Sequence, residues 1–569
     1  MQTEVRDPIP GVVYPDPGAL KTYLESGEVE LTTLAEAFKA AAQKYPSNVV
    51  LAGPEGNLTS RQLDEASDRL ALALSKLGIK PLDRVVLQLP NCNQLFIVMI
   101  ACFKAQIIPM CTLHAHRRAE ISYLGNHASA VAHFIATDNA KFDFGAFATE
   151  MRAAVPTLKH VIVARGELPA GMADAHDMQA MIDAQPLAEA QAFVQNQDRD
   201  PLQVGVFQLS GGSTGIPKII PRFNYEYVYQ FRKVAEFNSY DSNEVFMIPT
   251  PVVHNANMGC MSLPVMLAGG TYLVAPTVTP QVFLRMLVRY RPTGMGVVGP
   301  LLDRFQELGI SKKVKFTPRG LIGAYALRRL QGVVSMNSGA QAEATLHVPG
   351  LHVYGMTEGL LMFTQPDDPE EVRHNCVGRP VSRFDEVRLV DPVTFEDVPL
   401  GETGECWTKG PYTIRGFFDA EELNKESFVD GFYRTGDLLS AREVNGQIYY
   451  AFEGRIKDVI DRGGEKINCQ EIERVLIQHP NILSAALVAM PDRAYGEKAC
   501  AFLTLTEGTE TLSLADVAQF LDGEGLAKYK WPERLKVMDD LPVTHLNKPD
   551  KMRMRVMITE ELEKEQATA

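Results

Sequence analysis

A short segment rich in hydroxyl and glycine residues is the strongest chemical signal in this chain. Residues 209–218 read LSGGSTGIPK and follow the apolar run 204–207, with Gln208 between them. Glycines let backbone amides approach an anion, Ser and Thr hydroxyls add donors, and a lysine adds positive charge. In this segment a strand is followed by hydroxyl residues and glycines and then by a lysine. This order predicts a loop that binds nucleotide phosphates rather than a flexible surface turn. Its candidate residues are Ser210, Gly211, Gly212, Ser213, Thr214, Gly215 and Lys218, the last also a catalytic candidate.

Other features of the sequence argue against several classes of protein. The GxxxxGK[ST] spacing of P-loop NTPases is absent from the segment. A formal net charge of −14 argues against a broad nucleic-acid interface, and the eight cysteines form no CxxC pair that would indicate zinc. The N-terminus does not resemble an export signal, and Lys104 and Pro109 interrupt the apolar segment 95–111. We therefore expect a cytoplasmic protein with neither a nucleic-acid nor a membrane partner.

The candidate loop needs a large scaffold, and 569 residues are too many for one small domain. Helical periodicity over residues 34–45 and 60–77 alternates with strand-like runs at 83–89, 131–136, 160–164, 244–248, 270–275 and 294–298. Segment 95–111 is predicted to be a buried helix followed by a strand. This alternation predicts a large layered α/β domain.

The pattern changes towards the C-terminus. Short strand candidates at 386–390, 404–408 and 446–451 predict a β-rich subdomain that closes the large domain. After Arg455, a helix over 469–479, a strand over 485–490 and a helix over 513–521 predict a small α+β domain. We expect an N-terminal domain over residues 1–456 and a mobile C-terminal domain over 457–569.

Three further motifs follow the loop in a fixed order: YGMTE at 354–358, YRTGD at 433–437 and GRIKD at 454–458. Together with the loop, they resemble the adenylate-forming superfamily of acyl-CoA synthetases, luciferases and peptide-synthetase adenylation domains. The segments FQLSGGSTGIPKIIPR, PYTIRGFF and RGGEKIN look most like stand-alone aryl-acid ligases that act on dihydroxybenzoate or salicylate. The resemblance covers nearly the whole chain and implies ATP and Mg2+ as cofactors.

The resemblance also implies which residues bind the nucleotide. Glu358 is expected to hold Mg2+ and Thr357 to contact phosphate, within a segment that includes Gly355 and Met356. Tyr354 is expected to stack on adenine. Asp437 is expected to accept hydrogen bonds from the ribose hydroxyls with help from Arg455, which suits a carboxylate. The adenine site is completed by Gly339, Ala340 and Gln341.

The same family carries a catalytic lysine near its C-terminus, and Lys548 aligns with it. That lysine bridges the substrate carboxylate and the α-phosphate during adenylation. The family has Gly-Lys where this chain has Asn547-Lys548, and Lys551 is a nearby rival. The family also alternates between two domain poses by rotation at a residue that matches Lys457. The second pose would bring a thioester-forming loop to the site, namely Arg462, Gly463, Gly464, Glu465 and Lys466.

Residues 246–264 are expected to line the acid pocket, with His254 near the phosphates or at the entrance. In aryl-acid ligases the residue that matches Asn255 hydrogen-bonds the hydroxyl ortho to the carboxylate. Cys260 stands where dihydroxybenzoate enzymes have serine, and Leu361 where they tend to have valine. Because both changes disfavour a second hydroxyl, they favour salicylate. Gly339 and Gly359 complete the lining, while Ala256 replaces the usual aromatic residue and leaves room for a substituted ring or anthranilate.

The leading hypothesis is an enzyme that makes salicyl-AMP and pyrophosphate and then passes the acyl group to a thiol. CoA is slightly favoured as the acceptor. The main alternative is the loading of a siderophore aryl carrier protein through its phosphopantetheine. A non-catalytic nucleotide sensor is disfavoured because Lys218, Glu358, Asp437 and Lys548 are all present. Monomer and homodimer both remain open.

Overall fold

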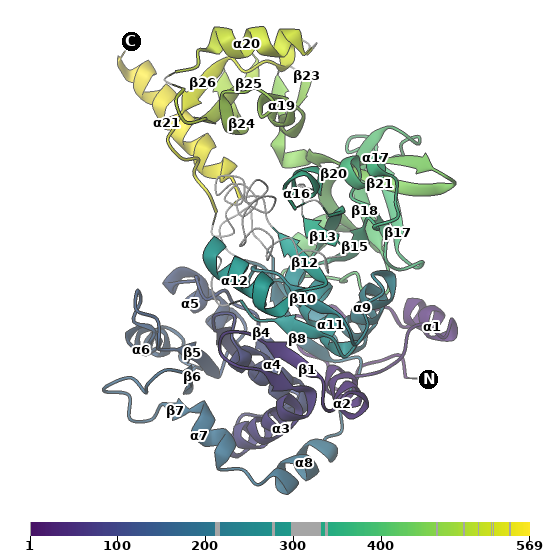
Figure 1. The fold of residues 1–569 in the computed structure, drawn as a ribbon, viewed down its shortest axis with the longest axis vertical. Helices are drawn as coiled ribbons and strands as arrows, with labels where there is room; N and C mark the ends of the chain where they lie inside the picture. Colours follow the sequence, from purple (N-terminus) through teal and green to yellow (C-terminus); the bar gives the residue numbers. More distant parts are fainter. Residues whose placement is uncertain are drawn as a thin grey trace. The chain divides into compact units, whose positions relative to one another are not determined.

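The computed structural model describes residues 2–210, 217–275, 279–297, 332–335, 339–346, 348–462, 465–492, 495–509, 511–524, 526, 528–544 and 548–568. The chain divides into two compact units (Figure 1). The first comprises Met1–Glu386 with Thr408–Tyr433, and the second Val387–Trp407 with Arg434–Ala569. The expected domain boundary between residues 456 and 457 stays a prediction.

The first unit contains a seven-stranded sheet that carries the predicted phosphate loop. Its order is β7–β6–β5–β3–β4–β8–β9, and all neighbours are parallel except β8 and β9. The central strands are continuous apolar runs because helices cover a parallel sheet. The strands are β3 (Arg84–Gln88), β4 (Ile108–Met110), β5 (Ala132–Ala136), β6 (His160–Arg165), β7 (His176–Asp177), β8 (Val204–Leu209) and β9 (Ile219–Phe223).

Helices surround this sheet, and sequence signals explain their ends. Thr33 and Thr59 each close a capping box at the start of α2 (Leu34–Lys44) and α3 (Ser60–Lys76). Helix α4 (Asn93–Ala105) is apolar around most of its circumference because nearly all of it is buried. It contacts β4 and β6, and α2, α3 and α4 pack against one another (Figure 1). The other helices of this region are α1 (Pro17–Glu25), α5 (Arg118–His127), α6 (Phe144–Ala154), α7 (Met178–Asp183) and α8 (Leu187–Gln195).

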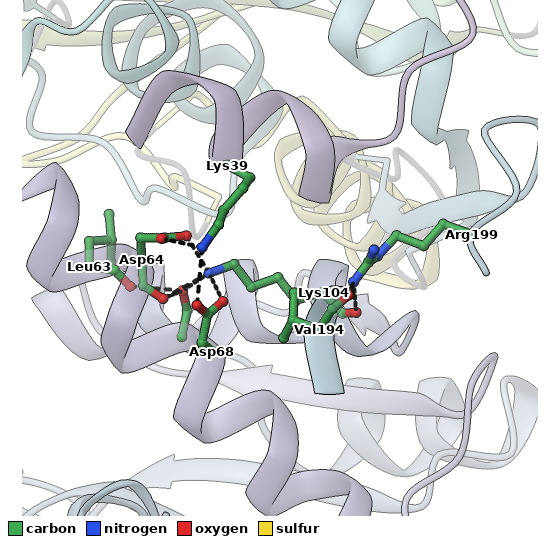
Figure 2. A network of polar contacts seen from close by, with 8 residues as sticks. Lys39, Leu63, Asp64, Asp68, Lys104, Val194 and Arg199 are labelled. Carbon is green, nitrogen blue, oxygen red and sulfur yellow. Dashed lines mark hydrogen bonds and ion pairs between the residues drawn. The ribbon is translucent and has the colours of Figure 1, made fainter. Parts of the chain in front are cut away.

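A buried ion cluster joins α2, α3 and α4 (Figure 2). The Lys104 ammonium is fully buried, and it donates to Asp64 Oδ1 at 2.7 Å, Asp68 Oδ1 at 2.5 Å and Ser67 Oγ at 2.8 Å. Lys39 Nζ pairs with the same two carboxylates at 2.7 and 3.2 Å. A buried charge is tolerated only when it is paired and hydrogen-bonded, and here two lysines balance two aspartates. The lysine that interrupts the apolar segment 95–111 therefore serves helix packing.

A nine-stranded sheet forms the rest of the first unit's framework, with the order β16–β15–β14–β13–β12–β10–β11–β1–β2. Its central strands are parallel, whereas β14 and β15 form an antiparallel hairpin. The strands are β1 (Val49–Ala52), β2 (Leu58–Thr59), β10 (Val245–Met247), β11 (Thr271–Leu273), β12 (Gly294–Val297), β13 (Gly332–Ser335), β14 (Gly350–Met356), β15 (Gly359–Phe363) and β16 (Arg379–Pro380).

Further elements of the first unit connect or follow these strands. Between β10 and β11 the chain forms a short helix, a π-helix and a second short helix in succession. These are α10 (Asn255–Asn257), η1 (Met258–Ser262) and α11 (Leu263–Leu267). The remaining elements are α9 (Asn224–Phe237), α12 (Pro280–Tyr290), α16 (Gly339–Leu346), α17 (Glu370–Asn375), α18 (Glu421–Ser427) and β19 (Phe428–Val429).

The second unit contains two sheets. In the first, β17 (Glu386–Val390), β18 (Thr403–Lys409) and β20 (Phe432–Val444) lie in this order, and β21 (Gln447–Arg455) pairs with β20. The second has the order β23–β22–β25–β24, and β26 pairs with β25. Its elements are η2 (Ile456–Asp458), β22 (Val459–Arg462), β23 (Glu465–Asn468), α19 (Cys469–Leu476), β24 (Ile482–Asp492), β25 (Gly496–Leu505), α20 (Leu514–Gly523), η3 (Lys528–Lys530), β26 (Arg534–Val537) and α21 (Lys551–Thr568).

Strand alternation gives this small sheet a core on each face. Leu487 packs with residues of α19 and α20, whereas Val488 packs with Met554 and Ile558 of α21. Successive side chains of a strand point to opposite faces, so one strand serves both cores. The predicted α/β class with a small α+β C-terminal region is confirmed. Among the helices of the described ranges, none is both long and apolar enough to cross a membrane.

Candidate active site

The two ends of the predicted phosphate loop are fastened to each other. Ser210 N donates to the Lys218 carbonyl at 3.0 Å, and Lys218 N donates to Ser210 Oγ at 3.1 Å. These bonds extend the antiparallel pairing of β8 with β9 by one step. The Lys218 ammonium lies 4.8 Å from the centre of the Phe417 ring. Five predicted phosphate-binding residues lie outside the described part, namely Gly211, Gly212, Ser213, Thr214 and Gly215.

Arg222, four residues after Lys218, is fully buried and connects several motifs. Its Nε donates to Glu226 Oε1 at 2.8 Å, and its Nη2 donates to Gln230 Oε1 and to the Tyr412 carbonyl, both at 2.9 Å. Its Nη1 donates to the carbonyl of Thr357. A guanidinium group is planar and carries several N–H donors, so it can donate to several acceptors around it at once. Strand β9 is thereby attached to the segment of the predicted magnesium ligand.

Thr357 and Glu358 form the turn between β14 and β15, and neighbouring backbone fixes this turn. Ile414 N donates to the Glu358 carbonyl at 2.7 Å. Gly359 has a φ of +138°, and a Cβ there would lie 2.6 Å from Thr413 Cα, so glycine is required. The turn holds Glu358 in place, and the residue is 8% exposed.

A magnesium ion fits a donor set of this kind. Mg2+ commonly takes one or two carboxylates together with waters and substrate phosphates. The described residues contain no group of three or more His, Cys, Asp or Glu side chains that could hold a metal by themselves. A single carboxylate such as Glu358 suits a metal that arrives with its nucleotide.

The predicted acid-recognising residue, Asn255, is buried at the start of α10. Its Oδ1 accepts a hydrogen bond from Tyr227 Oη at 2.8 Å, and its Nδ2 donates to the Met356 carbonyl at 3.4 Å. A Cβ on Gly259 would lie 2.6 Å from both Asn255 Oδ1 and Gln230 Nε2, so this close packing requires glycine. The structure therefore brings Asn255 next to segment 354–358, which is predicted to bind the nucleotide.

His254 caps the short helix that follows it. Its Nδ1 accepts a hydrogen bond from Ala256 N at 3.2 Å. In a neutral imidazole the other nitrogen then carries the hydrogen, so Nε2 is the donor. Such a donor suits contact with an anionic oxygen.

The two residues predicted to disfavour a second ring hydroxyl are both buried in the main core. Cys260 lies in the π-helix η1 and is 1% exposed, and burial raises the pKa of its thiol to about 12. Leu361 lies in β15 and is 2% exposed. It pairs with Gly355 of β14, and its N donates to Tyr412 Oη at 3.2 Å. Leu361 is thereby in register with the segment that contacts Asn255.

The predicted adenine segment begins at the N-terminus of α16. Gly339 N donates to His352 Nε2 at 3.2 Å, and a Cβ on Gly339 would lie 2.5 Å from the same ring. Burial, and to a smaller extent the nearby His374, lowers the pKa of His352 to about 4. His352 is therefore neutral and able to accept this bond near pH 7. Ala340 and Gln341 lie in the same helix, and Tyr354 lies in β14 with 9% exposure.

In the second unit, Asp437 and Arg455 face each other across β20 and β21. Arg455 Nε donates to Asp437 Oδ1 at 2.9 Å, and Asp437 N donates to Thr435 Oγ1 at 3.0 Å. The Asp437 side chain is 10% exposed, whereas that of Arg455 is 57% exposed. The carboxylate is thus oriented by its neighbours.

Lys548 and its rival Lys551 have different surroundings. Desolvation and the positive charge of Arg455 lower the pKa of Lys548, and the charge of Asp437 opposes this change. Lys551 forms an ion pair with Glu473 at 2.9 Å. Desolvation is the largest influence on Lys551 and acts to lower its pKa, but Glu473 and other nearby acidic groups outweigh it and raise the pKa. Lys548 therefore lies within the electrostatic influence of the Asp437–Arg455 pair, while Lys551 is held in an ion pair.

The predicted thioester-forming loop is described only in part. Arg462 Nε donates to Glu533 Oε1 at 2.8 Å, and its guanidinium lies 4.2 Å from the centre of the Tyr495 ring. Gly463 and Gly464 lie outside the described residues, as do the side chains of Lys457, Glu465 and Lys466.

Sequence reasoning missed the residues that position the site. Arg222, Tyr227, Gln230 and His352 were not among its candidates, although each contacts a predicted site residue or its segment. One signal was available: an arginine lies within the otherwise apolar strand IIPRF, and a glutamate follows it four residues later. A charge in a buried strand indicates a specific partner.

Comparison with known proteins identifies the class. The AMP-binding enzyme family matches residues 38–418, and the AMP-binding enzyme C-terminal domain matches residues 471–548. The chain is 35% identical over 551 residues to 2,3-dihydroxybenzoate-AMP ligase of Bacillus subtilis (strain 168), which covers 95% of this chain and 96% of the relative. It is 34% identical over 546 residues to salicylyl-CoA synthase / salicylate adenylyltransferase of Streptomyces sp, covering 95% and 96%. The structure of apo MbtA from Mycobacterium smegmatis has a TM-score of 0.70 and 31% identity, covering 96% of this chain and 98% of the other.

The chain belongs to the AMP-binding enzyme family and is an adenylate-forming ligase. Enzymes of this class use ATP and Mg2+ to activate a carboxylic acid, and they pass the acyl group to the thiol of CoA or of a carrier-protein phosphopantetheine. The predicted superfamily, fold class and cofactors are confirmed.

Proposed function

We propose that this enzyme activates an aryl acid with a hydroxyl ortho to its carboxylate, namely salicylate, and transfers the salicyl group to CoA. The observation that carries this proposal is the buried amide of Asn255, held between Tyr227 and the Met356 carbonyl beside the nucleotide segment. A fixed polar group in a mostly apolar pocket is the usual source of specificity for a small aromatic ligand. The two aryl-acid relatives at 34% and 35% identity support the same substrate class.

In the first half-reaction, the substrate carboxylate attacks the α-phosphorus of ATP. A bond forms between the carboxylate oxygen and phosphorus, and the bond to pyrophosphate breaks. Lys218 and the loop it ends contact the phosphates, and Lys548 holds the carboxylate against the α-phosphate. Glu358 would hold Mg2+, which would supply positive charge to neutralise the phosphates. Positioning and charge neutralisation are the main requirements of phosphoryl chemistry.

Separate residues are proposed to bind the adenine and the ribose of ATP. Tyr354 packs on adenine near Gly339, and Asp437 accepts the ribose hydroxyl hydrogens with Arg455 beside it. The Asp437–Arg455 bond of 2.9 Å supports this role because it orients the carboxylate before the nucleotide arrives. Pre-organised groups lose less freedom when they bind a ligand.

In the second half-reaction, a thiolate attacks the acyl carbon and AMP leaves with the electron pair. We propose that the region 457–569 rotates at Lys457 between the two steps, withdrawing Lys548 and bringing the 462–466 loop to the site. CoA is favoured as the acceptor because a chain of net charge −14 offers no general attraction to an acidic carrier protein. Loading of an aryl carrier protein is the second candidate.

Salicylate is favoured over 2,3-dihydroxybenzoate by two buried residues. A 3-hydroxyl would meet the weak thiol donor of Cys260 and the bulk of Leu361. A hydroxyl buried without a good partner is penalised by roughly 1–3 kcal/mol, which corresponds to about tenfold or more in selectivity. Salicylate has no group at that position and avoids this penalty.

The proposed activity is tested with pure protein, ATP, Mg2+ and salicylate, with and without CoA. 2,3-Dihydroxybenzoate and anthranilate serve as parallel acids, and the products are identified by mass spectrometry. Salicyl-CoA with AMP and pyrophosphate is the expected result. Enzyme-bound salicyl-AMP without a thioester would select the carrier protein as acceptor. A preference for dihydroxybenzoate would overturn the substrate assignment, and the absence of any aryl adenylate would overturn the proposed function.

A further inference from the structure

The side chain of Tyr227 is positioned to control the predicted acid-recognising residue. Tyr227 lies on α9, is fully buried, and donates its hydroxyl hydrogen to Asn255 Oδ1 at 2.8 Å. The Arg222 guanidinium lies 4.4 Å from the centre of its ring, which holds the ring in a cation–π contact. Arg222 is itself hydrogen-bonded to Glu226 and Gln230, so the guanidinium that contacts the Tyr227 ring is held in place.

The orientation of the Asn255 amide follows from its two partners. The Met356 carbonyl can only accept a hydrogen bond, so the amide nitrogen faces it at 3.4 Å. The amide oxygen then faces Tyr227, whose hydroxyl is the donor. Burial raises the pKa of Tyr227, while Arg222 and a hydrogen bond with Gln208 oppose this rise. The phenol remains protonated near neutral pH and keeps its donor hydrogen.

This arrangement leaves a single type of contact for a bound acid. The amide oxygen is engaged by Tyr227, and one amide hydrogen points to Met356. Within the described ranges, no protein acceptor is found for the second amide hydrogen. A substrate group beside Asn255 therefore meets an N–H donor.

We propose that Tyr227 is a specificity-determining positioning residue, which orients Asn255 so that the enzyme prefers acids whose ortho group accepts a hydrogen bond. The inference rests on the proposed function and extends it. A phenolic oxygen such as that of salicylate accepts from the amide. The amino group of anthranilate is a poor acceptor because its lone pair is conjugated with the ring, and its own N–H groups would face the amide N–H. Tyr227 thus acts through Asn255 and touches no substrate atom.

The test compares the wild type with Tyr227→Phe, which removes one oxygen and keeps the ring under Arg222. Tyr229→Phe is the matched control, because Tyr229 lies on the same helix and its hydroxyl forms a buried hydrogen bond of 2.7 Å with Ser382 instead. The value of kcat/KM for salicylate, anthranilate and benzoate is measured by ATP–pyrophosphate exchange. Benzoate has no ortho group and reports any general damage to the pocket.

For Tyr227→Phe we expect the salicylate-to-anthranilate ratio of kcat/KM to fall about tenfold, the size of one lost orienting hydrogen bond. The benzoate value should stay within about twofold, and Tyr229→Phe should leave the ratio unchanged. An equal loss for all three acids, or an unchanged ratio, would overturn the inference while the wild-type activity still supports the proposed function. If the wild type activates none of the acids, the proposed function fails and the inference fails with it.

Asn255→Asp provides a second test that does not depend on Tyr227→Phe folding. An ionised aspartate only accepts hydrogen bonds, so the preference should move from ortho acceptors to ortho donors. We expect the anthranilate-to-salicylate ratio of kcat/KM to rise by about tenfold or more relative to the wild type. A variant that keeps the wild-type ratio would show that donor orientation at this position does not set specificity.

Discussion

The guanidinium of Arg222 donates a hydrogen bond to the backbone carbonyl of Thr357, which lies 135 positions away in the chain. Arg222 lies in β9, the strand after the predicted phosphate loop, and Thr357 precedes the predicted magnesium ligand Glu358. The same guanidinium reaches the Tyr412 carbonyl and, through Gln230, the Gly259 carbonyl of the π-helix. One buried side chain therefore links three segments with different predicted roles.

Replacement of Arg222 by methionine should strongly destabilise the first unit. It would leave Glu226 buried without its cation, and burial already raises the pKa of Glu226 against the effect of Arg222. Removing one partner of a buried pair typically lowers the free energy of unfolding by about 3–5 kcal/mol. Urea unfolding at neutral pH measures this loss. The double variant Arg222→Met/Glu226→Gln should lose less, and an exposed control, Arg232→Met, should change stability by less than about 0.5 kcal/mol. A double variant no more stable than the single one would contradict the explanation.

Lys548→Met should block adenylation more than thioester formation. The ammonium is proposed to stabilise charge only where the carboxylate meets the α-phosphate, and loss of one such group slows the step by about 10²–10³-fold. ATP–pyrophosphate exchange measures the first step, and release of AMP from added salicyl-AMP and CoA measures the second. Lys551→Met is the control, because Lys551 forms an ion pair with Glu473. An equal loss of rate in both half-reactions would contradict a role of Lys548 confined to adenylation. A comparable loss of exchange in Lys551→Met would also contradict the assignment of the catalytic role to Lys548.

A buried carboxyl group near the proposed acid pocket should make stability depend on pH. Burial raises the pKa of Asp385 to about 8, although a hydrogen bond from Tyr412 acts against the rise. No hydrogen-bond partner for its Oδ1 lies in the described part of the chain. In the unfolded chain this group ionises near its ordinary pKa. Between about pH 4 and pH 8 the folded state therefore binds more protons than the unfolded state. The stabilisation is complete below this range and is lost as the pH rises through it.

Asp385→Asn removes this titration because an amide mimics the neutral acid. We expect the variant to gain stability over the wild type as the pH rises from about 5 to about 7.5, by up to about 1.4 kcal/mol per pH unit. Urea unfolding of both proteins across this range gives the difference. Parallel stability curves would show that Asp385 is ionised in the folded protein. Salicylate activation should survive, since Tyr412 Oη, the acceptor for Leu361 N, remains in place.

Much of the framework could be predicted from local patterns. The predicted helix 60–77 is α3 (Ser60–Lys76), and the predicted strand 386–390 is β17. These elements have clear apolar periodicity and turn or capping signals at their ends. The predicted helix 469–479 ends earlier, at Leu476, because the chain turns there towards β24. Strand order was not predictable, since it depends on pairings between segments distant in sequence.

The residues that position the candidate site could not be predicted either, because they contact it from distant parts of the sequence. Asn255 could be selected from its motif, but Tyr227 lies 28 positions earlier and resembles an ordinary core aromatic in sequence. The π-helix over Met258–Ser262 leaves no clear signature in sequence, because it differs from an α-helix by a single extra residue. Local patterns thus supplied the candidates for the groups that do chemistry, while the residues that contact these candidates emerged only from tertiary contacts.

The double variant Cys260→Ser/Leu361→Val should shift preference towards 2,3-dihydroxybenzoate. Serine supplies a hydroxyl partner for the 3-hydroxyl of the ring, and valine is smaller than leucine. The same serine would lie buried without a partner when salicylate is bound, which lowers efficiency with that acid. Together these effects should raise the ratio of kcat/KM for dihydroxybenzoate over salicylate by about tenfold or more.

ATP–pyrophosphate exchange with each acid measures the shift, and each single variant should give a smaller change than the pair. Cys500→Ser makes the same chemical change at a fully buried cysteine of the second unit and controls for general loss of stability. Its ratio should equal that of the wild type. If the double variant keeps the wild-type ratio although both acids are activated, Cys260 and Leu361 do not discriminate between them, and the preference must then be set by other residues of the pocket.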